Sequence, residues 1–127
     1  MSFHIWALVA AGGAIGSLGR YLMAGWVNLH APSGVFPWGT FAVNVLGCAV
    51  GGMIAVWSDQ GQWLSPTARL FLFTGILGGF TTFSAFGLET LQLLRSGETS
   101  CALLYAAGSV LAGVAAMALT STLARQV

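Results

Sequence analysis

The scarcity of charged side chains constrains this sequence more than any other feature. Four basic and three acidic residues are spread over 127 positions, and they leave charge-free stretches at residues 1–19, 21–58, 70–88 and 99–124. Charged residues make up about a quarter of an ordinary soluble domain, whereas they make up 6% of this chain, in which 57% of the residues are hydrophobic. The sequence therefore predicts a protein that resides in a lipid bilayer.

Four segments of the sequence are long enough to cross a bilayer. A membrane-spanning helix needs about 20 predominantly apolar residues, and the predicted helices cover residues 5–27, 38–57, 66–94 and 101–123. Tryptophan occurs at both ends of the second segment, as expected for side chains at the two membrane–water interfaces. The predicted fold class is an all-α membrane protein, with residues 1–127 forming a single four-helix transmembrane bundle.

The N-terminal apolar stretch could be a cleaved signal peptide or a retained helix. It lacks a basic leader segment, and it stays apolar to about Val27. The hydrophobic region of a signal peptide is shorter than this. We therefore expect the stretch to remain in the protein as its first helix.

Several classes of function receive no support from the sequence. The net charge is only +1, which gives no reason to expect a nucleic-acid partner. Cys48 and Cys101 show no recognised metal spacing, and we interpret them as small packing residues. There is no nucleotide-binding motif and no plausible pair of nucleophile and base, so the protein is not expected to be an enzyme.

The basic residues do not favour one membrane orientation. An excess of Lys and Arg normally marks the cytoplasmic loops, but here Arg20 and Arg95 fall on one side of the four spans and Arg69 and Arg125 on the other. A chain without this bias can insert both ways, which allows an antiparallel, dual-topology homodimer with a two-fold axis in the membrane plane. The alternative is a fixed topology set by other features.

Each of the first three predicted helices contains a pair of glycines four residues apart. This spacing lets helix backbones approach closely in lipid. The pairs are Gly12 and Gly16, Gly47 and Gly51, and Gly75 and Gly79. The pattern predicts close helix packing without identifying which helices meet.

The third predicted helix has its least helix-like sequence in mid-span, GGFTTFSAF at residues 78–86. Irregular backbone inside a membrane is tolerated only where protein or water covers it. Two glycines followed by β-branched Thr81 and Thr82 are consistent with a broken helix, whose free carbonyl oxygens would suit a small cation such as Na⁺. An intact helix, with the threonine hydroxyls bonding back to preceding carbonyls, is equally consistent with the pattern.

Aromatic and polar side chains accompany this stretch. Phe83 and Phe86 share one face of a helix, with the hydroxyl of Ser84 between them in sequence. Phenylalanines usually pack or face lipid, but the positive edge of an aromatic ring can also face an anion. Asn44, one turn after Thr40 on the second helix, is either an interhelical hydrogen-bonding group or a donor directed into a pathway.

Arg20 and Glu89 are the only charged residues well inside the predicted spans. Charged residues at such positions are candidates for function. Both lie toward the same side of the membrane within one subunit. They are predicted to form either a structural ion pair or a vestibule that attracts anions.

Three stretches of the sequence carry a family resemblance. They are GGAIGSLGRY (residues 12–21), WGTFAVNVLG (38–47) and TGILGGFTTFSAFGLE (74–89). They closely resemble the signatures of the Fluc (CrcB) family of fluoride channels, and the similarity extends over essentially the whole chain, including the four-span layout. The third stretch is the most specific, because its glycines, hydroxyls and phenylalanines occur in one fixed order.

The resemblance implies an antiparallel homodimer with two fluoride pores, each built from both subunits, and a broken third helix. It implies a structural Na⁺ at the dimer interface, held by the backbone carbonyls of Gly78 and Thr81 from both subunits. Fluoride would pass the ring edges of Phe83 and Phe86. Other polar positions along the pore that the resemblance assigns are Asn44, Ser84, Thr40, Tyr105 and Ser109.

One position departs from the family pattern. The family commonly has a second hydroxyl after the serine of the third signature, where this sequence has Ala85. Fluoride is small and tightly hydrated, so a missing donor is expected to make its dehydration harder. Alternatively, Ser84 and backbone amides suffice and the missing hydroxyl is dispensable.

The implied function is passive export of fluoride down its electrochemical gradient across a bacterial inner (plasma) membrane. One alternative is a proton-coupled exporter of the small multidrug-resistance kind, which needs a carboxylate deep in its first helix. The first helix here has Arg20 and no acidic residue. A second alternative is a non-transporting membrane assembly subunit, for which a set of mid-helix hydroxyls and amides has no obvious use.

Overall fold

The chain folds into helices only, within the residues that the computed structural model describes, 3–59 and 64–126. The elements are α1 (Phe3–His30), α2 (Trp38–Asp59), α3 (Pro66–Arg69), a π-helical stretch η1 (Leu70–Leu77), α4 (Gly78–Phe80), α5 (Phe83–Arg95) and α6 (Thr99–Ala124). Four stretches are long and apolar enough to cross a membrane: Phe3–His30, Trp38–Asp59, Pro66–Arg95 and Thr99–Ala124. The prediction of an all-α, multi-pass membrane protein is confirmed, and each helix extends up to three residues beyond the predicted bounds.

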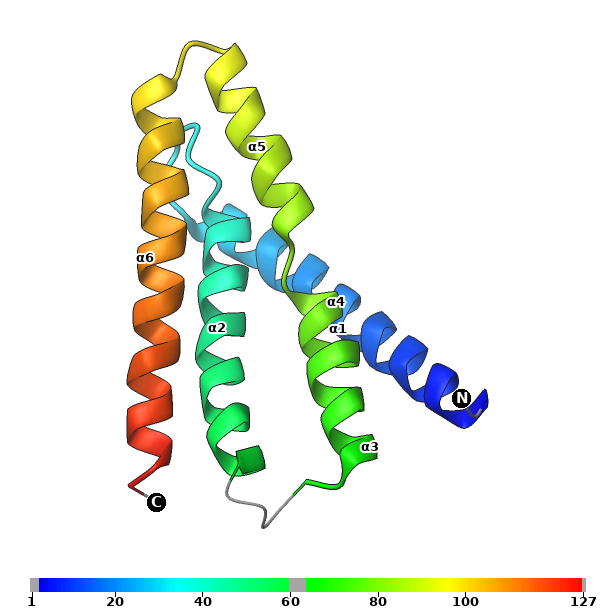
Figure 1. Ribbon diagram of the computed structural model, residues 1–127. Helices are drawn as coiled ribbons and strands as arrows, with labels where there is room; N and C mark the ends of the chain where they lie inside the picture. Colours follow the sequence, from blue (N-terminus) through cyan, green and yellow to red (C-terminus); the bar gives the residue numbers. More distant parts are fainter. Residues whose placement is uncertain (1–2, 60–63, 127) are drawn as a thin grey trace.

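The helices form a bundle in which one member crosses the others at an angle. Figure 1 shows α2 and α6 running side by side, with α5 beside the N-terminal part of α6. The long helix α1 runs obliquely across the bundle and packs against η1 and α4. The segment from α3 to α5 therefore packs against α1 at η1 and α4, and it also contacts α2 and α6.

Small residues allow the contact between α2 and α6. A Cβ atom added at Gly52 would lie 2.5 Å from the Met117 carbonyl oxygen, and one added at Gly113 would lie 3.1 Å from Cys48 Sγ. Side chains at these glycines would push the two helices apart. The Cys48 thiol thus fills the space that Gly113 leaves, which agrees with its interpretation as a packing residue.

The glycine pairs of α1 and the third span face each other. A Cβ atom at Gly12 would lie 2.9 Å from Gly75 Cα, and a Cβ atom at Gly16 would collide with the Ile76 carbonyl oxygen. Gly79 is packed in the same way against the backbone of Gly13. Backbone-to-backbone contact of this kind is how small residues hold helices together in lipid, and here it anchors α1 to the part of the third span just before Thr81.

The third span starts as the sequence predicts but is less regular than an α-helix. Pro66 occupies the first turn of α3, where its missing N–H costs nothing, and the Ser65 hydroxyl accepts a hydrogen bond from the Ala68 N–H at 3.2 Å. The next two turns, η1, are π-helical. Such wide turns are rare and often occur near functional positions, and nothing in the sequence pattern indicated this one.

Candidate functional site

The helical conformation stops at Phe80 and resumes at Phe83. Thr81 (φ −79°, ψ 154°) and Thr82 (φ −148°, ψ 113°) are both extended. The Thr81 hydroxyl does bond back to the Leu77 carbonyl at 2.9 Å, the contact that the intact-helix alternative invoked. The Thr82 hydroxyl instead caps the following helix, because it accepts a hydrogen bond from the Ala85 N–H at 3.2 Å.

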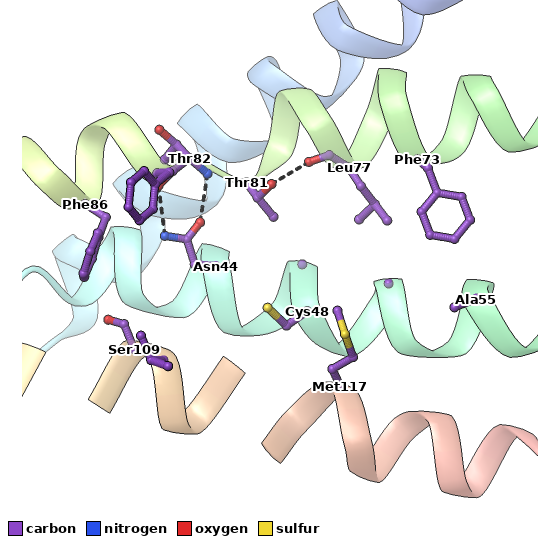
Figure 2. Close-up of a pocket in the computed structure, with 14 residues that line it drawn as sticks. Asn44, Cys48, Ala55, Phe73, Leu77, Thr81, Thr82, Phe86, Ser109 and Met117 are labelled. Atoms are coloured by element: carbon purple, nitrogen blue, oxygen red, sulfur yellow. Dashed lines mark hydrogen bonds between the residues drawn. The ribbon is translucent and has the colours of Figure 1, made fainter. Parts of the chain in front are cut away.

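The side-chain amide of Asn44 holds this two-residue interruption. Asn44 Oδ1 accepts the Thr82 N–H at 2.9 Å, and Asn44 Nδ2 donates to the Thr82 carbonyl at 3.1 Å. Figure 2 shows the amide reaching from α2 to both backbone groups of Thr82. One of the two alternatives for Asn44, an interhelical hydrogen-bonding group, therefore describes its contacts, and one N–H of the amide is left over from this pairing.

A second freed backbone group is satisfied from α1. Arg20 Nε donates to the Gly79 carbonyl at 3.1 Å, and the Ser17 hydroxyl donates to the same oxygen at a longer 3.4 Å. In a continuous helix this carbonyl would accept the N–H of Phe83. The guanidinium group thus replaces a helical hydrogen bond at the interruption and brings a positive charge close to it.

A groove runs along one side of the interruption. It has a volume of about 570 Å³, and residues of α2, η1, α5 and α6 line it together with Thr81 and Thr82. The Phe83 and Phe86 rings lie in its wall with centroids 5.6 Å apart, as the shared helix face predicted. Phe83 is 85% exposed. Figure 2 shows Phe86 next to Ser109, whose hydroxyl is buried and forms no hydrogen bond within the described part of the chain.

A second cavity lies on the other side of the same segment. Its volume is about 590 Å³, and its lining includes Arg20, Thr40, Thr82 and Ala85. Thr82 therefore belongs to the walls of both cavities, so the extended segment and the first turn of α5 separate them. Ala85 faces the cavity that contains Arg20, whereas the two phenylalanines face the groove.

The Glu89 carboxylate is bound by two hydroxyl groups from other helices. The Thr40 hydroxyl donates to Oε1 at 2.7 Å, and the Tyr105 hydroxyl donates to Oε2 at 2.6 Å. Short hydrogen bonds of this type to a charged acceptor are stronger than those between neutral groups. The Tyr105 side chain is fully buried, and its ring contacts those of Phe36 and Phe86, with centroids 5.4 and 5.2 Å away.

Arg20 and Glu89 do not meet. Arg20 Nε is bonded to the Gly79 carbonyl, and both Glu89 oxygens are bonded to hydroxyls. Within residues 3–59 and 64–126, no salt bridge joins the two side chains. The structural ion pair is therefore not formed between these two side chains within the described part of one subunit, and the vestibule alternative stays a prediction.

The structure brings together most residues that the sequence singled out, and it adds two others. Five of these residues lie at the interruption: Gly78, Thr81, Asn44, Ser84 and Phe83. A second cluster forms around Glu89, one to two turns further along α5, and includes Thr40 of α2 and Tyr105 of α6. The additional residues are Ser17 and Asn28, whose side chains form hydrogen bonds with the backbone of Gly79 and Gly39. Ser17 lies three residues before Arg20 on the same helix face, a spacing that could have indicated a shared partner.

These features define a multi-pass membrane protein with an interrupted third span whose backbone groups are satisfied by side chains of α1 and α2. Residues 7–121 match the family described as CrcB-like protein, Camphor Resistance (CrcB). The chain belongs to this family.

Curated relatives cover nearly the whole chain. A protein of Methylobacillus flagellatus is 49% identical over 110 residues, 87% of this chain and 86% of the relative. A protein of Hyphomonas neptunium is 50% identical over 121 residues, 94% of each chain. One of Thermus thermophilus is 50% identical over 114 residues, 90% of this chain and 88% of the relative. All three are named fluoride-specific ion channel FluC.

Proposed function

We propose that the protein is a fluoride-selective ion channel, not an enzyme, which lets fluoride leave the cell passively through the plasma membrane. The observation that carries this proposal is the interruption at Thr81 and Thr82, held open by Asn44 beside two phenylalanine rings. It occurs in a chain that is about half identical to proteins named for fluoride conduction. In a bacterium this membrane is the inner membrane.

The groups around the groove suit a small, strongly hydrated anion. Conduction requires that polar groups replace the hydration shell while binding stays weak enough for release. The Ser109 hydroxyl and the second N–H of Asn44 are donors at the groove, and the edges of Phe83 and Phe86 carry partial positive charge. The Ser84 hydroxyl lies at the interruption, 3.3 Å from the Thr82 hydroxyl. Thr40 and Tyr105 differ, because their hydroxyls already donate to Glu89.

The cavity that contains Arg20 would serve as the vestibule. The guanidinium is held in place by the Gly79 carbonyl, yet it still lines the cavity. A positive potential in a confined cleft raises the local concentration of anions. Fluoride would then approach the extended segment from the Arg20 side.

The channel is proposed to be an antiparallel homodimer in which the interruption of the third span is the functional helix break. An 85% exposed Phe83 at the groove is one support, because a partner subunit could cover it and complete the wall. The balanced basic residues are another. Labelling from both sides of the membrane of a cysteine introduced at Ser33, in a protein whose Cys48 and Cys101 are replaced by alanine, tests this topology; labelling from one side only would contradict it.

Two backbone carbonyls at the interruption fit a structural Na⁺. In a continuous helix the carbonyls of Gly78 and Thr81 would accept the N–H groups of Thr82 and Ala85. The first of these donors is bonded to Asn44 instead, and the second to the Thr82 hydroxyl. Carbonyl oxygens are suitable ligands for a hard cation. When bound between subunits, the ion would supply positive potential and hold the dimer together.

This cation proposal has a test that does not depend on transport. The melting temperature of the purified protein is expected to be lower when N-methylglucamine, which is too large for such a site, replaces Na⁺. Equal melting temperatures in the two salts would contradict a structural sodium ion.

A proton-coupled exporter fits the structure less well. That mechanism needs a carboxylate within the first helix, and α1 contains no Asp or Glu. The carboxylate nearest the candidate site, Glu89, is bound by two hydroxyls from α2 and α6. Passive conduction, in contrast, does not require Glu89 or any other carboxylate to exchange protons with solvent.

Efflux from liposomes that contain only the purified protein tests the proposed function. Fluoride should leave rapidly without a proton gradient, and chloride should not. Phe83→Ile is expected to slow fluoride efflux by about tenfold, equivalent to ~1.4 kcal/mol in a barrier. Phe3→Ile is a matched control, because Phe3 is 81% exposed but lies at the start of α1. Equal efflux for the two variants would show that Phe83 does not lie in the fluoride pathway.

A further inference from the structure

The first turn of α2 is capped by a side chain from α1. Asn28 Oδ1 accepts the Gly39 N–H at 2.8 Å, although the two residues are 11 positions apart. The first N–H groups of a helix have no acceptor within their own helix and need one elsewhere. Gly39 is the second residue of α2, so Asn28 acts as a helix cap supplied by a neighbouring helix.

The fit at this contact is tight. Gly39 is buried, and a Cβ atom added to it would lie 2.8 Å from the Ala24 carbonyl oxygen and from both amide atoms of Asn28. Only glycine allows α1 to approach the start of α2 this closely. The hydrogen bond and the contact together fix where α2 begins relative to α1.

The residue after Gly39 belongs to the Glu89 cluster. The Thr40 hydroxyl donates to Glu89 Oε1 at 2.7 Å, while the Tyr105 hydroxyl donates to Oε2. A displacement of the first turn of α2 would move Thr40 away from the carboxylate. Phe86, one turn before Glu89 on α5, packs on the Tyr105 ring.

We infer that Asn28 is a positioning residue for the pore: it holds the first turn of α2 through the Gly39 N–H, and thereby sets Thr40 against Glu89. This inference rests on the proposed function, since its consequence is a change in fluoride conduction. Asn28 acts through Thr40 and Glu89, not through contact with the ion. The role requires an acceptor oxygen at position 28.

The test combines a structural and a functional readout. Hydrogen exchange of the Gly39 amide and fluoride efflux are measured for Asn28→Ala, Thr40→Val and the double variant, with lipid-exposed Leu18→Ala as the control. Loss of a helix cap should accelerate Gly39 exchange and slow efflux by about fivefold each. Asn28→Asp keeps the acceptor and should retain the protection of Gly39.

The double variant separates an action through Thr40 from a direct one. If Asn28 acts through Thr40, efflux of Asn28→Ala/Thr40→Val should equal that of Thr40→Val alone. A further fivefold loss in the double variant would show that Asn28 acts independently, and this would overturn the inference.

Two other results are also decisive. Unchanged Gly39 exchange in Asn28→Ala would overturn the cap itself. Accelerated exchange together with no fluoride efflux from the unmodified protein would overturn the proposed function, and with it the positioning role, while leaving the cap established. Failure of the inference and failure of the proposed function are thus distinguishable.

Discussion

The interruption of the third span and the Glu89 cluster are both polar regions within apolar helices, but their hydrogen bonds serve different groups. At the interruption, Asn44 and Arg20 bond to backbone atoms of Thr82 and Gly79. At the cluster, hydroxyls bond to the carboxylate of Glu89. The first region therefore maintains an irregular backbone, and the second maintains a charge.

This difference predicts how the two regions respond to mutation. An unsatisfied backbone group in a membrane costs free energy because no water in the hydrocarbon core can form the missing hydrogen bond. Loss of a partner at the interruption should therefore affect folding and conduction together. Loss of the charge at the cluster should leave the helices in place and change mainly conduction.

Asn44→Leu is expected to have the largest effect. It leaves the N–H and carbonyl of Thr82 without partners, which should destabilise the protein by about 4 kcal/mol, given ~1–3 kcal/mol for each unsatisfied group. Both the melting temperature in detergent and the fluoride efflux rate should fall sharply. Leu46→Ala, two residues along α2 and 43% exposed, is the control and should change neither by much. A stable, conducting Asn44→Leu protein would contradict the role given to Asn44.

Glu89→Gln is expected to have an intermediate effect confined to conduction. The side chain keeps its shape, but it loses its charge and can no longer accept from both hydroxyls as a carboxylate does. We expect efflux to change by about tenfold, equivalent to ~1.4 kcal/mol in a barrier, with a nearly unchanged melting temperature. Glu98→Gln, at an exposed position before α6, is the matched control. A fall in melting temperature as large as that expected for Asn44→Leu would show that Glu89 maintains the fold, as Asn44 does.

Ala85→Thr should have the smallest effect. Ala85 lies in the wall of the cavity that contains Arg20, and a threonine there would add a donor to that wall. Fluoride efflux should rise by only about threefold, because a hydroxyl in an open cavity wall is expected to contribute near the lower end of the ~0.5–1.5 kcal/mol net value of a hydrogen bond. Ala85→Val, which adds the same volume without a hydroxyl, is the control. A similar increase in both variants would show that volume and not the donor matters.

The sequence predicted the spans well because the positions of the charged residues, which can be read directly from it, limit where a helix can end in a bilayer. Seven charged residues in 127 leave few ways to place helix ends in a bilayer, and the predicted bounds lie within three residues of those found. The glycine pairs predicted close approach for a similarly local reason, although the partners, Gly12 with Gly75, came only from the structure.

The state of the third span could not be decided from the sequence. Glycines and β-branched residues are compatible with a continuous helix or an extended segment, and the deciding contact comes from Asn44, 38 residues away from Thr82. The separation of Arg20 from Glu89 has the same origin. Each charge has a closer partner on a neighbouring helix, and helix proximity is a property of the packed bundle.

The fluoride current across a planar bilayer is the most direct test of the central claim, which is passive and selective fluoride conduction. Under a tenfold fluoride gradient, with chloride and pH equal on both sides, the current should reverse at about 59 mV, the equilibrium potential of a monovalent ion. A chloride gradient alone should not shift it. A reversal potential that shifts when a pH gradient is imposed in a separate recording, or the absence of any fluoride current, would contradict the account.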